Sequence, residues 1–121
     1  MRRRGYRRQR DEVQFYEYSM DLYGYAAKTD ATTAVELKLS RWTRAFEQAL
    51  IYQLCADFVY LALPVHSAAR VEIPLLKRHG LGLIGVRPRM RCVMLLEARQ
   101  SEVVMPNYRD FYIRLMQEPP I

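Results

Sequence analysis

Three residues of this chain have the types and spacing that metal-assisted phosphoester chemistry needs. Asp21 stands in one β-favouring stretch, and Glu36 and Lys38 stand two residues apart in the next. If the two stretches pair as a hairpin, all three side chains emerge on one face of a sheet. Two carboxylates there need a counter-charge, and oxygen ligands suit Mg²⁺ or Mn²⁺. The hypothesis is that Asp21 and Glu36 hold the ion while Lys38 orients a hydroxide or neutralises the transition state.

The same residues also have an ordinary explanation. A Glu-x-Lys pair on an exposed strand face is commonly a solvated ion pair. A polar stripe on the following helix favours the site, because Arg41, Arg44, Gln48 and Tyr52 fall within roughly 80° of one another on the helical wheel. That stripe could equally be a plain boundary between buried and wet surface.

Hydrophobic periodicity predicts the elements that position these residues. Alternation predicts a strand over 12–19, β-favouring residues predict a second over 20–27, and alternation predicts a third over 34–40 after a polar turn. A helix over 41–56, with Ser40 as N-cap, leads to a buried strand over 58–64. Further on, we expect a helix over 71–79 ended by Gly80, paired strands over 81–86 and 90–97, and a terminal helix over 108–117.

This order predicts a single α/β domain with a central mixed sheet flanked by helices. The helical crossover between strands 34–40 and 58–64 makes those two strands parallel.

The stretch from Asp21 to Pro64 resembles the PD-(D/E)xK nuclease superfamily, small bacterial and archaeal members in particular. The matching segments are MDLYGY with Asp21, AVELKLS with Glu36 and Lys38, and RWTRAFEQALIY with Gln48 and Tyr52. The resemblance implies a restriction-endonuclease-like core and hydrolysis of DNA phosphodiester bonds with Mg²⁺ or Mn²⁺. It also implies that Asp21 and Glu36 bind the metal and that Lys38 assists the attacking water. Gln48 and Tyr52 would then help to place the active site or the DNA.

Two features depart from that family's pattern. Met20 stands where the proline of the motif would be, and only the arginine-rich segment precedes the first strand, where such nucleases usually have a helix.

The positive charge of the chain is concentrated at one end. The formal net charge is +6, and six arginines lie in the first ten residues. Such an arm attracts polyphosphate through counterion release, although it equally suits a solubilising tail. The predicted organisation is a flexible basic arm over 1–11 and a nuclease-like domain over 12–118. The residues expected to contact DNA are Arg2, Arg3, Arg4, Arg7, Arg8, Arg10, Arg41 and Arg44.

Composition bounds the remaining possibilities. Half of the 121 residues are hydrophobic and 26% are charged, which favours one folded domain over a disordered chain. No apolar run approaches the roughly 20 residues that span a bilayer, so no membrane contact is expected. Two cysteines allow at most one disulfide, which favours a reducing, cytoplasmic compartment. The spacing of Cys55, His66, His79 and Cys92 matches no recognised zinc site.

Two alternatives to the nuclease stay open: a non-catalytic nucleic-acid-binding module, and an assembly protein whose sheet is completed in a homo-oligomer.

Overall fold

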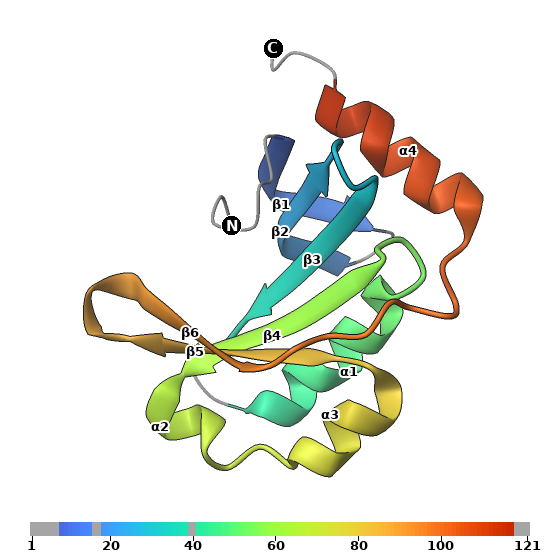
Figure 1. Ribbon diagram of the computed structural model, residues 1–121. Coiled ribbons are helices and arrows are strands. Elements are labelled where there is room, and N and C mark those ends of the chain that lie inside the picture. The colour runs from blue at the N-terminus through green and yellow to red at the C-terminus, as the bar shows by residue number, and fades with distance from the viewer. Residues whose placement is uncertain (1–7, 16–17, 39–40, 118–121) are drawn as a thin grey trace.

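Six strands form one mixed sheet whose spatial order is their order along the chain (Figure 1). The computed structural model describes residues 8–15, 18–38 and 41–117, with side chains from Tyr23 onward except Met90. The strands are β1 (Arg8–Phe15), β2 (Tyr18–Ala26), β3 (Ala31–Leu37), β4 (Phe58–Pro64), β5 (Gly82–Arg87) and β6 (Arg91–Leu96). The helices are α1 (Trp42–Tyr52), α2 (Val65–Ala68), α3 (Ile73–His79) and α4 (Pro106–Gln117). The predicted fold class, a single α/β domain with a mixed sheet flanked by helices, is confirmed.

The centre of the sheet is the parallel pair of β3 and β4, joined by α1. β4 has the bounds that its apolar run predicts, and its five middle residues are buried. β3 begins at Ala31, three residues earlier than expected. The reason is that Thr32, taken for part of a polar turn, is fully buried, with its backbone N–H and its hydroxyl both donating to Asp57. The remaining ladders are antiparallel except β4–β5.

The first two strands differ from the sequence prediction. A single strand over 12–19 was expected, whereas β1 ends at Phe15 and β2 begins at Tyr18, with these two residues paired. The expected arm over 1–11 is also shorter, because Arg8 and Arg10 already pair with Tyr25 and Tyr23 of β2. No described helix precedes β1. The run around residues 15–18 has no Gly, Pro or Asn, so nothing in it marks a turn.

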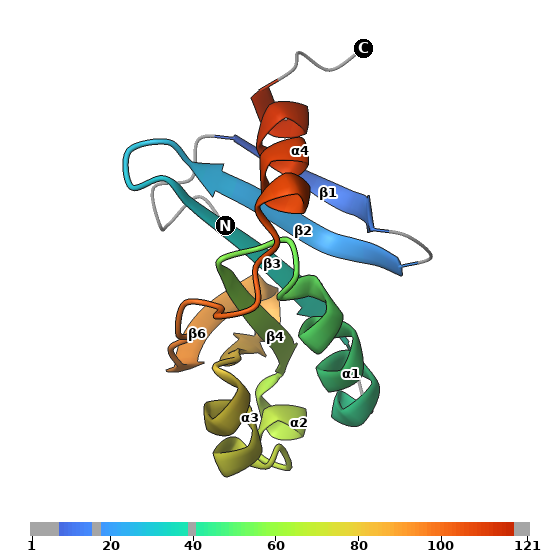
Figure 2. The same ribbon diagram turned by 90° about the vertical axis from the view of Figure 1, so that its right-hand side faces the viewer.

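Helices cover one face of the sheet. Figure 2 shows α1 and α4 on the side turned to the viewer, with α1 against β3 and β4 and α4 against β1 and β2. Buried side chains from both layers make the main core; the largest are Tyr23, Tyr52, Leu61, Leu63, Leu76, Leu81 and Leu83. None of the described helices is long and apolar enough to cross a bilayer.

The opposite face has a smaller core, which the chain after β6 helps to cover. Val35, Tyr60, Ala62 and Ile84 cluster there, with Ala98 packed against them. The returning segment passes so close to Gly82 that a Cβ at that position would contact the Tyr60 ring and lie 2.8 Å from the Ala98 backbone nitrogen. Only glycine fits this crossing.

Helix boundaries agree with the sequence to within a few residues. α1 ends at Tyr52 rather than at residue 56, and its N-cap is Arg41, in the left-handed conformation at φ 56°, rather than Ser40, which lies outside the described residues. α3 begins at Ile73, two residues later than expected, and ends at His79 with Gly80 as its C-cap, whose φ of 74° explains the glycine. The short α2 was not predicted, and α4 begins two residues early, at Pro106.

Candidate functional site

Glu36 and Lys38 lie at the carboxyl end of β3, beside the matching end of β4. Glu36 is paired with Leu61 of β4, and its side chain is only 2% exposed. Lys38 Nζ lies 3.3 Å from Glu36 Oε2, and the Lys38 side chain is 31% exposed. The backbone N–H of Lys38 donates to Ala62 O at 3.0 Å, which continues the ladder past β3. The site therefore joins a buried carboxylate to an amine that reaches solvent, at the end of parallel strands where open α/β sheets bind ligands.

Backbone pairing brings Asp21 beside this ion pair. At this end of the antiparallel β2–β3 ladder, the outermost residues paired are Leu22 and Val35. Asp21 precedes Leu22 and Glu36 follows Val35, so their backbones lie at the same level of the sheet. This arrangement agrees with the predicted hairpin. The side chain of Asp21 lies outside the described part of the structure, so its sharing of a metal with Glu36 stays a prediction.

The polar stripe of α1 runs from solvent into the core. Arg41 and Arg44, at the start of the helix, are exposed, and Gln48 is half-buried. Tyr52 is fully buried in the main core. Each step of four residues turns about 40° around a helix, so two steps from Arg44 bring the stripe to the apolar face. Tyr52 consequently packs α1 onto the sheet and has no access to bulk solvent.

Two buried oxygen atoms of the kind that bind metal ions come from β3 and from α1, the helix that covers it. One is the Glu36 carboxylate, and the other is Gln48 Oε1, which is removed from solvent and has no hydrogen-bond partner among the described residues. A buried amide oxygen without a partner costs about 1–3 kcal/mol, so a bound water or ligand is expected to satisfy it. Hard oxygen donors of this kind fit Mg²⁺ or Mn²⁺, which need only one or two carboxylates with several waters. Among the described side chains, no three His, Cys, Asp or Glu residues converge on one point.

The arginines expected to contact DNA divide into three groups. Arg2, Arg3, Arg4 and Arg7 lie outside the described residues. Arg8 and Arg10 belong to β1, and only their backbones are described. Arg41 and Arg44 are exposed at the N-terminal end of α1, where the helix dipole adds positive potential near Lys38.

A buried ion-pair cluster that the sequence did not predict lies at the other end of β3 and β4. Asp57, just before β4, is 5% exposed and accepts hydrogen bonds from Thr32 N at 2.9 Å and Thr32 Oγ1 at 3.1 Å. Arg109 of α4 donates from Nε to Asp57 Oδ1 at 3.1 Å and from Nη2 to Oδ2 at 3.0 Å. Arg109 Nη2 also donates to Asp30 O at 2.5 Å and lies 3.2 Å from Asp30 Oδ1. We call these four residues the Asp57 clasp.

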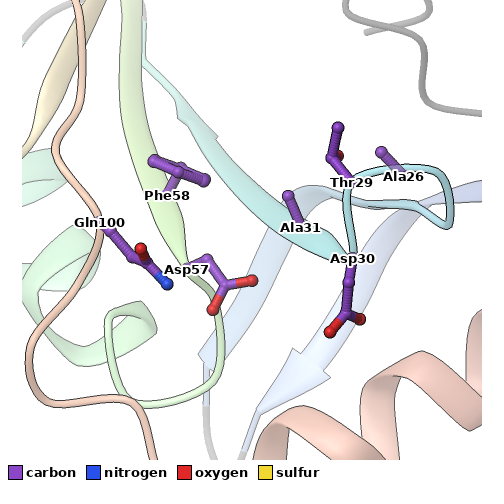
Figure 3. A pocket seen from close by; sticks show the side chains of 7 residues that line it. All are labelled: Ala26, Thr29, Asp30, Ala31, Asp57, Phe58 and Gln100. Carbon is purple, nitrogen blue, oxygen red and sulfur yellow. The ribbon is translucent and has the colours of Figure 1, made fainter.

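The Asp57 clasp borders a polar pocket of about 370 Å³. Its lining residues are Ala26, Thr29, Asp30, Ala31, Asp57, Phe58 and Gln100 (Figure 3). Hydrogen bonds from Tyr25 and from Arg109 lower the pKa of Asp30. Both carboxylates of the pocket are engaged by Arg109, so this cluster fixes α4 to the sheet and offers no free base.

The cysteines and histidines considered as zinc ligands do not form a metal-binding group among the described residues. Cys55 is buried, which raises the pKa of its thiol to about 12, whereas Cys92 is exposed. The His79 ring packs edge-on against Phe46 at 5.4 Å, and His66 is exposed on α2.

Comparison with known proteins supports the fold and leaves the activity open. No protein-family model matches the chain, and the curated proteins give no match. Among solved structures, the chain is similar to a protein of unknown function from Silicibacter pomeroyi, with a TM-score of 0.72 and 18% sequence identity. The similarity covers 96% of this chain and 75% of the other. At that identity it shows a shared fold.

Proposed function

We propose that this protein is a metal-dependent nuclease of the PD-(D/E)xK type that hydrolyses DNA phosphodiester bonds. The observation that supports the proposal most is the buried Glu36 carboxylate, ion-paired at 3.3 Å with Lys38, at the carboxyl end of a central parallel strand pair. Removing a carboxylate from water is costly, so a purely structural pair would gain little from this placement. A site that must hold a cation and an anionic substrate gains from it.

The residues have separate roles in this proposal. Asp21 and Glu36 would hold Mg²⁺ or Mn²⁺, with Gln48 Oε1 accepting a hydrogen bond from a water of the ion's shell. When bound, such an ion lowers the pKa of water and stabilises charge on phosphate oxygens. Lys38 places its ammonium where negative charge builds up in the transition state. Tyr52 is a packing residue that holds α1, and with it Gln48, against the sheet.

DNA is proposed as the substrate because exposed positive charge stands at the start of the helix that follows Lys38. Arg41 and Arg44 both lie in this part of α1. Phosphate contacts of this kind hold a nucleic acid without reading its sequence.

A cleavage assay tests the proposal. The protein should nick or degrade plasmid and linear DNA in Mg²⁺ or Mn²⁺ and be inactive in EDTA. Lys38→Ala should lower the rate by about 10²–10³-fold, which is the usual cost of losing one preorganised charge. Lys28→Ala removes the same charge from the exposed β2–β3 turn and should leave the rate unchanged.

Two results would argue against this function. Equal cutting by the Lys38→Ala and Lys28→Ala proteins would place the chemistry elsewhere. DNA binding without cleavage in either metal would instead support the alternative, a non-catalytic nucleic-acid-binding or assembly protein that keeps the nuclease fold.

A further inference from the structure

The β5–β6 hairpin carries three arginines at its tip. Arg87 ends β5, Arg91 begins β6, and Arg89 lies in the three-residue connection between them. All three side chains are exposed. In the part of the chain that the structure describes, none of them forms a salt bridge. The segment from Gly82 to Leu96 contains no acidic residue.

The local geometry is unfavourable unless an anion is present. Arg87 and Arg91 are directly paired across the antiparallel ladder. Like charges in that position repel each other and destabilise a hairpin. Arg89 has a φ of 65°, in the left-handed region that favours glycine. A sequence selected only for a stable turn would not combine these two features, so they suggest a function.

The hairpin tip lies at the same end of the sheet as Glu36 and Lys38. Leu37, Ala62 and Ile84 stand at one level across β3, β4 and β5, and Arg87 is three residues beyond Ile84. With strands about 4.8 Å apart and a rise of about 3.3 Å per residue, the backbone of Arg87 is roughly 12 Å from that of Lys38. Figure 1 shows the hairpin extending past this end of the sheet. Arg41 and Arg44 are exposed at the start of α1, which follows Lys38 in the chain, and the hairpin adds further positive charge at this end of the sheet.

We propose that Arg87, Arg89 and Arg91 bind the phosphate backbone of the DNA three to four nucleotides from the bond that is cut. The proposal rests on the proposed function for its choice of DNA. A two-stranded ribbon matches the major groove, which is about 12 Å wide. One DNA strand advances about 3.4 Å along the helix axis per phosphate, so a separation of roughly 12 Å corresponds to that number of nucleotides. Phosphates at the tip also relieve the repulsion between Arg87 and Arg91.

Salt-dependent binding tests the hairpin separately from catalysis. Fluorescence anisotropy measures affinity for a labelled 20-base-pair duplex in EDTA, which withholds the metal. The triple variant Arg87→Ala, Arg89→Ala, Arg91→Ala should lower the slope of log K against log salt by about 2.7, or 0.9 per phosphate contact. At 0.1 M salt, this corresponds to binding about two to three orders of magnitude weaker. The triple variant with lysine at these positions should keep the slope.

The matched control removes three cations from the other end of the sheet. It combines Lys28→Ala, Lys77→Ala and Arg78→Ala, all at exposed positions. Its slope should stay within one unit of the unsubstituted protein. A further variant, Arg89→Gly, should reduce the slope by about one while leaving the urea midpoint unchanged or higher, since it relieves the left-handed backbone.

Each outcome has a definite meaning. The proposal is overturned if the hairpin triple-alanine variant lowers the slope by less than one unit, or no more than the control. It is also overturned if that variant binds DNA normally but loses binding to phosphatidylserine vesicles, which would make the tip a membrane contact. Loss of DNA binding in the variant, together with no cleavage by the unsubstituted protein in either Mg²⁺ or Mn²⁺, would support phosphate binding by the hairpin and refute the nuclease.

Discussion

Replacing Arg109 by alanine should cost this protein a large share of its stability, because Arg109 is the counter-ion of a buried carboxylate. The Asp57 side chain is 7% exposed and the Arg109 side chain is 16% exposed, so water screens their interaction weakly. Breaking a buried pair by removing one partner costs about 3–5 kcal/mol. Thr32 still donates two hydrogen bonds to Asp57, so we expect the lower end, about 3 kcal/mol. That is roughly a hundredfold change in the folding equilibrium.

The same geometry ranks the related variants. Arg109→Lys keeps the charge but cannot form the fork to both oxygens of Asp57, so it should lose about 1–2 kcal/mol. Asp30→Ala should lose less than about 1 kcal/mol, since the Asp30 side chain is 69% exposed and its ion pair is screened. Urea titration followed by circular dichroism gives the three free energies of unfolding, and an unchanged m value shows that they are comparable.

A loss below about 1 kcal/mol in Arg109→Ala would refute the reasoning, because it would mean that Asp57 is adequately solvated or neutral in the folded protein. Because the Asp57 clasp lies at the far end of β3 and β4 from Lys38, the Arg109→Lys protein should keep the cleavage rate per folded molecule. A rate that falls with stability held constant would show that α4 belongs to the active site.

Three further predictions concern the metal and the thiols. Mg²⁺ at ten times its dissociation constant should raise the free energy of unfolding by about 1.4 kcal/mol. This gain in stability should vanish in Glu36→Gln but persist in the exposed control Glu47→Gln. Equal gains in both variants would show that Glu36 does not bind the ion. In the native protein at pH 8, iodoacetamide should modify Cys92 and spare Cys55, as peptide mass mapping would show, and rapid modification of both would contradict the burial of Cys55. Burial raises the pKa of the Cys55 thiol to about 12, above its value in the unfolded chain. The stability that the neutral thiol contributes is therefore complete below about pH 9 and is lost as pH rises toward 12. Cys55→Ala should reduce this alkaline loss of stability in urea titrations, and an unchanged pH dependence would contradict the prediction.

The central elements were predictable because local patterns determine them. The continuous apolar run of β4 has one explanation, a strand buried on both faces, and its bounds are correct. Gly80 marks the end of α3 because the left-handed C-terminal position favours glycine. The pairing of Glu36 with Lys38 follows from alternation, since residues two apart on a strand share a face.

What the sequence did not predict depends on contacts between distant residues. Thr32 belongs to β3 only because Asp57, 25 residues later, accepts its hydrogen bonds. Arg109 lies 52 residues beyond Asp57, and no local spacing connects them. The burial of Tyr52 likewise follows from how α1 sits on the sheet. The sequence shows that Arg87, Arg89 and Arg91 are positively charged. Their position at the same end of the sheet as Lys38 depends on the register of three strand pairs.

The sequential order of the strands makes the outer hairpin a replaceable module. Among the six described strands, none lies between two strands that precede it in the chain, so β5 and β6 add to the outside of a sheet already built from β1 to β4. A different ribbon grafted after α3 would leave Asp21, Glu36 and Lys38 in place, because they lie on β2 and around the end of β3. Exchange of the segment between Gly80 and Ala98 could therefore diversify the target preference of such a protein, provided that the new ribbon keeps apolar side chains at Leu83 and Ile84, which belong to the two cores.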